Sequence, residues 1–445
     1  MAVAFASWML AEARALLTRL DQVKPFALRE TMVPAAALSF QAQTAIESYL
    51  TRGRQELREQ VHEYLEWLRG PQARTATPTQ AHRRFVFLRL RFNAVLSQFD
   101  IFSEAMSQRS EADFGVWLSG LDVVARDGLA LPGYFDAPPV ICYLARGPGA
   151  AIRRARTRLP GGGENPVAIV RIPRERMIGS GIASSLMHEV GHQGAALLDL
   201  VPSLRKAVRQ QKTGPGLEAT AWQLWHRWLS EIVADLWAVA RVGVASTAGL
   251  VGVVSLPAAF VFRVNTDDPH PIPWIRVKLS SAVGEALYPH PQWKTLTRMW
   301  ESFYPADSLD PDRRSLLAAL EATMPRLVEV LIGHRPDSLG GRSLAEVMAT
   351  RERQPSQLAT LREAWRGDPA LMRRASPSLV FAVIGQARVD GAISPEAESG
   401  LLADLLKEWA LRSTLDSSEV CATKATGAPR SAVPAPVVYP AQAVI

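Results

Sequence analysis

The first 130 residues of the chain alternate between amphipathic segments and short polar breaks. The clearest segment covers residues 49–68, where apolar residues such as Leu57 and Val61 recur at helical spacing between charged positions. Residues with this spacing lie on one side of an α-helix, so the pattern predicts a helix with one buried face. The proline-containing stretch 70–78 predicts a loop, and a second helical block is expected over 85–124.

Short runs of β-branched residues replace this pattern further along the chain. Residues 139–144 and 166–172 are two such runs, and each predicts a β-strand. A helical piece is expected between them at 150–156, and the three glycines at 161–163 predict a turn. Another helix is expected to begin near Gly181, and helical periodicity dominates the chain beyond it. The expected fold class is therefore mostly α, an α+β arrangement with a small sheet.

These changes of pattern divide the chain into four parts. Residues 1–134 form an expected helical N-terminal region, and residues 135–300 hold the strands and the candidate chemistry described below. Residues 301–421 form an expected helical C-terminal region. Residues 422–445 are rich in proline, alanine and valine without periodicity, which predicts a disordered tail.

One uncharged stretch, Val242–Phe262, is long enough to cross a bilayer. Glycine, serine and proline residues interrupt it, including Gly249 and Pro257, and its apolar residues are mostly valine and alanine. This composition favours a buried helix and turn over a membrane span. Membrane association through this stretch remains the less favoured alternative.

Composition and charge narrow the class of protein. Of the 445 residues, 48% are apolar and 21% are charged, which are ordinary values for a globular chain and argue against wholesale disorder. The distant Cys142 and Cys421, with no secretory signal at the N-terminus, predict free thiols in the cytoplasm. The net charge is +7, but basic residues occur in scattered pairs such as Arg83-Arg84, so nucleic-acid binding is not expected.

The pentad His188-Glu189-Val190-Gly191-His192 carries the most specific chemistry in the sequence. On a helix, His188 and His192 lie one turn apart on one face, so both imidazoles can reach a single metal ion. Glu189 lies one step around the helix, where its carboxylate can take a proton from water beside the metal rather than bind the metal.

A second helix adds two carboxylates to this picture. Starting at Ala221, every third or fourth residue forms an apolar stripe interrupted only by Glu231 and Asp235, one turn apart. Unpaired charges in a buried stripe are costly, so both carboxylates need a partner. One explanation makes Glu231 a third metal ligand and Asp235 the acceptor of a histidine ring N–H. The alternative pairs them with a core arginine, Arg227 or Arg241.

This set of residues resembles the gluzincin pattern of zinc metallopeptidases. The alanine before Asp235 makes it most similar to the HtpX-like and CAAX-prenyl-endopeptidase-like branch. The resemblance implies a zincin-like core in which His188, His192 and Glu231 bind Zn²⁺. It also implies that Glu189 is the general base and that Asp235 orients a ligand.

A third element of the same branch follows the second helix. There a His-Pro pair precedes an arginine six positions after the histidine, and this chain has His270-Pro271 and Arg276. The resemblance implies that His270 or Arg276 helps to stabilise the oxyanion. It covers about residues 165–280 and leaves the flanking helical regions without a counterpart.

The expected function is therefore a zinc-dependent endopeptidase that acts on protein or peptide substrates. The strand at 167–172 is either an edge along which a substrate pairs or an ordinary core strand. The alternative function is a non-catalytic helical scaffold or binding protein with a structural metal site. A fourth protein ligand, such as His226 or Asp199, would favour that alternative because structural sites are closed.

Overall fold

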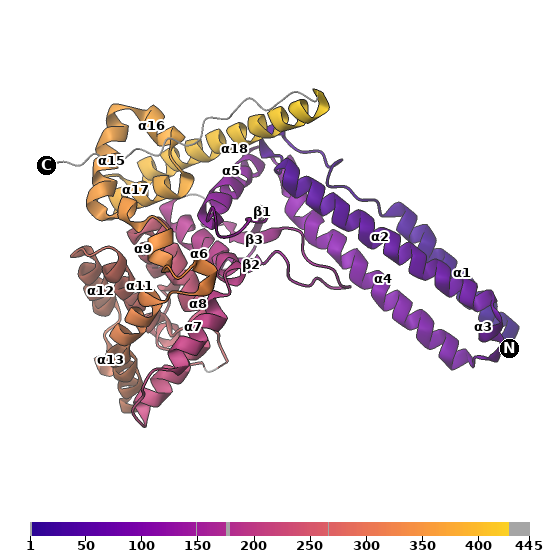
Figure 1. Ribbon diagram of the computed structural model, residues 1–445, viewed down its shortest axis with the longest axis horizontal. Helices are drawn as coiled ribbons and strands as arrows, with labels where there is room; N and C mark the ends of the chain where they lie inside the picture. The colour runs from indigo at the N-terminus through magenta and orange to yellow at the C-terminus, as the bar shows by residue number, and fades with distance from the viewer. Residues whose placement is uncertain (1, 148, 175–178, 266, 427–445) are drawn as a thin grey trace.

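The computed structural model describes residues 2–147, 149–174, 179–265 and 267–426. It is mostly helical with one small sheet, as the sequence predicts (Figure 1). In chain order, its helices and strands are α1 (Ala2–Gln22), α2 (Phe40–Arg69), α3 (Pro71–Thr75), α4 (Pro78–Ser107), α5 (Ala112–Leu129), β1 (Val140–Ala145), β2 (Ala151–Arg153), β3 (Ala168–Pro173), α6 (Ser180–Leu197), α7 (Leu200–Arg209), α8 (Leu217–Val242), α9 (Val244–Val254), α10 (Ala258–Val261), α11 (Pro273–Leu287), α12 (Gln292–Phe303), α13 (Pro311–Gly333), α14 (Leu344–Val347), α15 (Pro355–Gly367), α16 (Pro369–Arg374), α17 (Pro377–Val389) and α18 (Pro395–Thr426).

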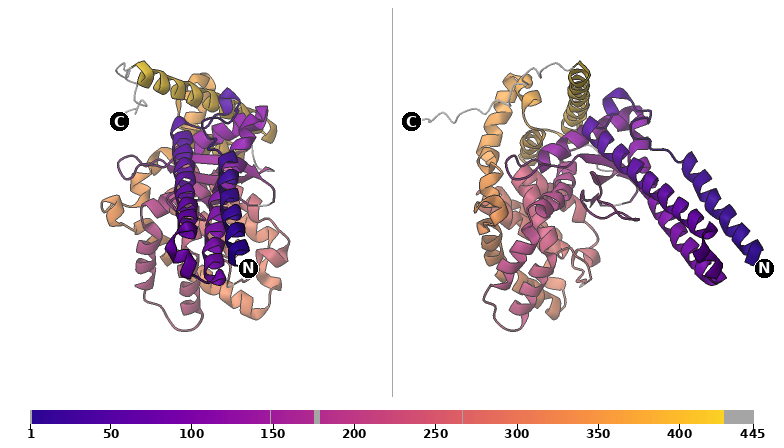
Figure 2. Two further views of the ribbon diagram at one scale, coloured as in Figure 1. Left: turned by 90° about the vertical axis from the view of Figure 1, so that its right-hand side faces the viewer. Right: turned by 45° about the vertical axis from the view of Figure 1, so that its right-hand side comes forward.

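Helices α1, α2 and α4 pack side by side as an arm that projects from the body of the molecule (Figures 1 and 2). Their apolar faces meet along the arm, with Leu57 and Val61 of α2 buried against the core that includes Phe85 and Phe92 of α4. The helix predicted at 49–68 is confirmed as part of α2. The loop predicted after it is wrong in part, because α3 forms a short helix there with proline at its first position, where proline is well tolerated.

The sheet has the strand order β1-β3-β2. Strand β1 runs parallel to β3, and β2 pairs antiparallel with the other side of β3. The strands predicted at 139–144 and 166–172 are confirmed, but the helical piece predicted at 150–156 is wrong because β2 lies there. Pairing with the backbone of β3 outweighs the local helical preference of this short stretch. Strand β3 is central, so of the two alternatives left open for this strand the structure has the ordinary core strand.

The two faces of the sheet belong to different hydrophobic cores. Ile141 and Ile169 face the arm and complete its core. Cys142 and Val170 point the other way, into the core formed with α5, α6, α17 and α18. Cys142 is buried there as a free thiol. The sheet therefore joins the arm to the body, and β3 leads towards α6.

Side chains seal the outer edge of β1. The backbone N–H of Cys142 donates to Asp122 at 2.6 Å, and its carbonyl accepts from Arg109 at 2.6 Å. Two residues along, the N–H and carbonyl of Leu144 both bond to the side-chain amide of Gln108, at 2.8 Å each. An edge closed in this way cannot accept another strand.

The body is built around α8, which packs against α6, α7 and α13. Leu296 and Leu317, on either side of the predicted boundary at residue 300, belong to the same core as α8. Within the predicted tail, α18 continues to Thr426, and residues 427–445 lie outside the described residues.

The uncharged stretch Val242–Phe262 forms α9 and α10 with a bend between them. Val244 and Leu250 are buried as predicted, whereas Leu256 and Phe260 at the bend are 46% and 53% exposed. Among the helices in the described part of the chain, none is long and apolar enough to cross a membrane.

Candidate metal centre

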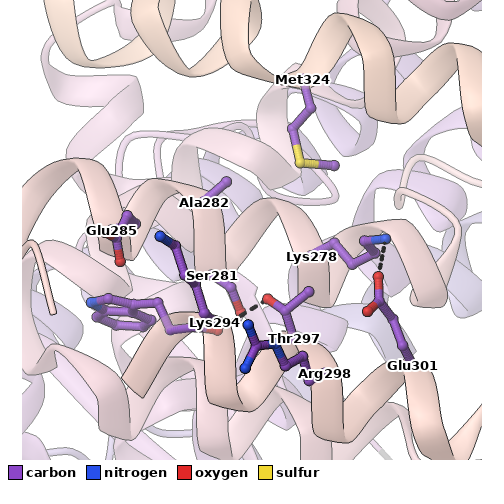
Figure 3. Close-up of a pocket in the computed structure, with 10 residues that line it drawn as sticks. Lys278, Ser281, Ala282, Glu285, Lys294, Thr297, Arg298, Glu301 and Met324 are labelled. Carbon is purple, nitrogen blue, oxygen red and sulfur yellow. Dashed lines mark hydrogen bonds and ion pairs between the residues drawn. The ribbon is translucent and has the colours of Figure 1, made fainter. Parts of the chain in front are cut away.

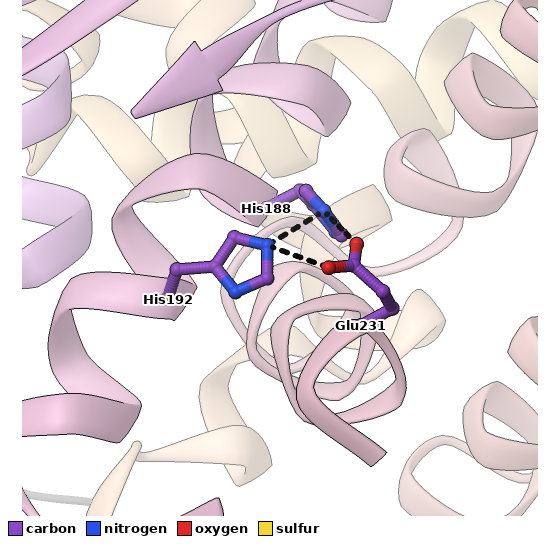
Figure 4. A group of neighbouring side chains, drawn as sticks. All are labelled: His188, His192 and Glu231. Carbon is purple, nitrogen blue, oxygen red and sulfur yellow. Dashed lines mark hydrogen bonds and ion pairs between the residues drawn. The ribbon is translucent and has the colours of Figure 1, made fainter. Parts of the chain in front are cut away.

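Helices α6 and α8 bring the candidate ligands together (Figure 4). His188 and His192 lie one turn apart on α6, and Glu231 points towards both imidazoles from α8. Their side chains keep 12%, 17% and 10% of their surface exposed, so solvent reaches the cluster. The sequence pattern anticipated this grouping from three residues on two separate helices.

Small residues let the two helices approach closely. A Cβ at Gly191 would lie 3.1 Å from the Cα of Ala234 on α8. A Cβ at Gly194 would lie 2.4–2.7 Å from the ring of Trp237, which is fully buried. The close contact holds the two imidazoles against the carboxylates of α8. The part that the two glycines play in this contact was missed from the sequence.

We expect Gly194→Ala to destabilise the fold. The new methyl group would overlap the Trp237 ring, and overpacking of this kind costs about 1–3 kcal/mol, which exceeds the gain of about 1 kcal/mol from replacing glycine with alanine in a helix. Gly400→Ala is the matched control, because a Cβ at Gly400 of α18 meets nothing within 4 Å. Chemical denaturation should show a lower free energy of unfolding for Gly194→Ala and no loss for Gly400→Ala. Equal stability of Gly194→Ala and the wild type would contradict this account of the helix contact.

The spacing of the donor atoms fits a tetrahedral zinc ion. His188 Nε2 lies 3.2 Å from Glu231 Oε2 and 3.2 Å from His192 Nε2, and His192 Nε2 lies 3.5 Å from Glu231 Oε1. Ligands at about 2.0–2.1 Å from zinc with tetrahedral angles are separated by about 3.3 Å. Three donors at this spacing leave a fourth position of the tetrahedron for water or substrate.

Asp235 fixes the orientation of one imidazole. Its Oδ1 lies 2.7 Å from His188 Nδ1 and holds a ring proton there, so that in the neutral imidazole the lone pair of Nε2 faces the cluster. Arg276 of α11 donates to both carboxylate oxygens of Asp235, at 2.7 and 2.8 Å. Asp235 therefore pairs with Arg276 and not with Arg227 or Arg241, the two arginines considered from the sequence.

His270 lies across Glu231 from the imidazole pair. Its Nε2 is 3.2 Å from Glu231 Oε2, and its Nδ1 is 2.7 Å from Asp268 Oδ1. The side chain is 47% exposed, in contrast to the buried Arg276. The structure thus brings both residues of the third sequence element to the centre, but in different positions. Asp268 was missed from the sequence, although an aspartate commonly accepts the backbone N–H two positions on, as Asp268 does from His270 at 3.0 Å.

Burial sets the properties of Glu189. This residue is 7% exposed, and its carboxylate forms no hydrogen bond within the described part of the chain. Burial raises the pKa of its carboxyl, although the neighbouring His188 and His192 oppose the shift. A carboxylate with a raised pKa and no fixed partner is suited to receive a proton at neutral pH.

The electrostatics of the cluster favour a cation. Burial lowers the pKa of His188, but the Asp235 carboxylate and the hydrogen bond to Glu231 outweigh it and raise the pKa to about 9. Burial raises the pKa of Glu231, but hydrogen bonds from three histidines outweigh it and hold the pKa well below its usual range. Glu189, Glu231 and Asp235 bring three carboxylates against the single guanidinium of Arg276. A divalent ion would take over the positive charge that a protonated His188 supplies when no metal is bound.

The two residues considered as a fourth ligand lie elsewhere. His226 lines a hollow with Val208 and Arg209, and burial together with the nearby Arg209 and Arg205 lowers the pKa of its imidazole. Asp199 precedes α7. Within the described residues, neither belongs to the group of donors that could hold one metal ion.

A separate pocket is lined by residues of α11, α12 and α13 (Figure 3). Its volume is about 400 Å³, and Lys278, Ser281 and Met324 are among its lining residues. Lys278 lies two positions after Arg276, which turns its side chain to the other face of the helix. No residue of this pocket belongs to the metal cluster.

Comparison with protein-family models, with curated proteins and with solved structures found no match to this chain. The case for a function therefore depends on the residues of the site and their geometry.

Proposed function

We propose that this protein is a zinc-dependent endopeptidase with a zincin-like catalytic core. The observation that carries the proposal is the tetrahedral spacing of His188, His192 and Glu231, with Glu189 beside them, whose carboxylate has no partner among the described residues. Three protein ligands and an open fourth position are typical of catalytic zinc sites, whereas structural sites are closed by four.

Each residue of the centre has a role in this reaction. Zinc bound there supplies a Lewis acid that acidifies water and polarises the substrate carbonyl. Glu189 takes a proton from the attacking water, whose oxygen bonds to the carbonyl carbon, and passes that proton to the departing nitrogen as the peptide bond breaks. When Glu231 binds zinc, the Nε2 of His270 can exchange its contact with Glu231 for a hydrogen bond to the carbonyl oxygen, as negative charge develops on that oxygen.

Asp235 and Arg276 act as positioning residues. The Nε and Nη2 of Arg276 both donate to the carboxylate of Asp235. The guanidinium therefore holds this carboxylate rather than the substrate. Asp235 in turn keeps the proton of His188 on Nδ1 and away from the metal-binding nitrogen. This proposal replaces the oxyanion role that the resemblance allowed for Arg276.

The sheet offers one edge for an extended substrate. The register turns the N–H and carbonyl of Ile152 in β2 away from β3, because Ala151 and Arg153 use theirs to pair with Arg171 and Ile169. The other edge of the sheet is closed by side chains, and β2 packs beside α6. A peptide that pairs with Ile152 would be held by its main chain, independently of its sequence.

We expect Ile152→Pro to weaken substrate binding. Proline removes an N–H that points outwards from β2, so no hydrogen bond of the sheet is lost, and proline is tolerated at such edge positions. Losing one hydrogen bond to the substrate should raise KM roughly 2–10-fold with little change in kcat. Steady-state kinetics on a fluorogenic peptide would measure KM and kcat separately. Zinc content and thermal unfolding would check that the variant is folded. An unchanged KM in a folded, zinc-loaded variant would rule out pairing at this position.

The proposed function is tested with the purified chain and an unfolded polypeptide substrate. We expect the protein to bind about one zinc ion per chain and to cleave the substrate. Phenanthroline should abolish cleavage, its non-chelating isomer should not, and added zinc should restore it. Failure to bind zinc, or cleavage that persists after the metal has been removed, would refute the proposal.

A further inference from the structure

A further cavity, of about 580 Å³, lies where β1 and β3 end. Its lining includes Arg146, Arg171, Arg174, Tyr143 and Gln108. None of these residues belongs to the metal cluster or to the open edge of β2. The cavity is a distinct concave site within the usual size range of about 300–1,000 Å³ for small-molecule pockets.

The parallel pairing of β1 and β3 brings the arginines together. Ala145 is in register with Pro173, so Arg146 and Arg174, the next residue of each strand, leave the sheet at the same end. Arg171 lies within β3, in register with Tyr143 of β1, and its side chain emerges on the same face as the tyrosine. Three guanidinium groups from the ends of β1 and β3 thus line the same cavity.

Two of these arginines show how the site is built. The guanidinium of Arg174 lies 5.4 Å from the centre of the Phe114 ring, a cation–π contact that orients it. The Nε of Arg171 is buried and has no hydrogen-bond partner among the residues that the structure describes. A buried, charged donor left unpaired is costly, and a ligand oxygen would satisfy it.

The charges around the cavity are unbalanced. Among the described residues that line the cavity, Glu104 is the one acidic residue, against three arginines. In the described part of the chain, neither Glu104 nor any other carboxylate forms an ion pair with Arg146, Arg171 or Arg174. Like charges held this close repel one another, and a bound anion would relieve the repulsion. Guanidinium forks match the paired oxygens of phosphate and carboxylate groups.

We propose that this cavity binds a small anion with at least two negative charges on phosphate or carboxylate oxygens. Arg171 donates from the floor, and Arg146 and Arg174 close around the ligand from the two strand ends. Gln108 is already committed to Leu144, so it holds the end of β1 in place rather than the ligand. The site does not depend on hydrolysis at the metal centre.

The proposal is tested by calorimetry. The zinc-loaded protein is titrated with inorganic phosphate and, in a separate experiment, with glutarate. We expect saturable binding of at least one of these anions. The anion that binds more tightly shows whether the cavity prefers a phosphate or a dicarboxylate ligand. Arg171→Gln and, as a second variant at the surface, Arg174→Gln should each weaken binding about tenfold or more, as expected for the loss of a charged hydrogen-bond donor. Zinc content and unfolding temperature without ligand show that each variant is folded.

Arg89→Gln is the matched control, since Arg89 is exposed on α4 and forms no ion pair within the described residues. It removes one positive charge far from the cavity and should leave the affinity unchanged. If the anions removed zinc from the protein, the calorimetric signal would change equally in the wild type and in all variants, so the difference between variants would remain. Absence of saturable binding of both anions, or equal weakening by Arg89→Gln and Arg171→Gln, would overturn the proposal.

Discussion

Replacing Glu189 with glutamine is expected to lower kcat about 10²–10⁴-fold while the protein keeps its zinc. The amide has nearly the shape of the carboxylate but cannot take a proton from the attacking water. Glu189 lies beside the three ligands and not among them, so the metal site should survive the substitution. Peptide cleavage and metal content, measured on the same preparation, separate these two effects.

Glu63→Gln provides the matched comparison for that variant. Glu63 is exposed on α2 in the arm, and the same chemical change there should leave both cleavage and zinc content as in the wild type. Wild-type activity in Glu189→Gln would remove Glu189 from the reaction. Loss of zinc from Glu189→Gln would instead indicate that the carboxylate takes part in holding the metal.

His188→Ala is expected to abolish zinc binding at this centre. Removing a residue that only orients a ligand typically costs about 10–100-fold in metal affinity, so removing a ligand should cost more than about 100-fold. His188 also holds the proton shared with Asp235, and its loss leaves that carboxylate with Arg276 alone. Competition with a chromogenic zinc chelator measures the affinity.

The control for this variant is His226→Ala. That residue is a histidine of α8 outside the donor group, so its removal should leave zinc affinity unchanged. Thermal unfolding gives a second measurement, because zinc that binds only the folded state should stabilise it by about 2.7 kcal/mol at a free concentration one hundred times the dissociation constant. Zinc-dependent stabilisation that persists in His188→Ala would place the metal elsewhere.

The sequence could predict those parts of the site that repeat with the period of a helix. His188 and His192 are four positions apart, as are Glu231 and Asp235, and such pairs share a face whatever surrounds the helix. The strands at 139–144 and 166–172 could also be predicted, because a run of β-branched residues is a signal contained in the local sequence. That Glu231 lies opposite the histidines was inferred from the cost of leaving its charge unpaired in an apolar stripe.

Contacts made across long stretches of chain could not be predicted in the same way. Strand β2 has only three residues, and its sequence Ala151-Ile152-Arg153 carries no strand signal apart from its pairing with β3. Likewise, nothing in the sequence around Arg276 tells whether it faces the substrate or Asp235. Both features depend on tertiary packing that overrides local preference.

The sheet that separates the arm from the body has a consequence for how the molecule melts. Ile169 and Val170 are neighbours in β3, yet one belongs to the core of the arm and the other to the core that contains α6. Unfolding either core exposes one face of β3 to solvent. Heat or denaturant should therefore unfold the arm and the imidazole-bearing helix in one cooperative transition, with no stage in which a detached arm leaves an intact centre behind.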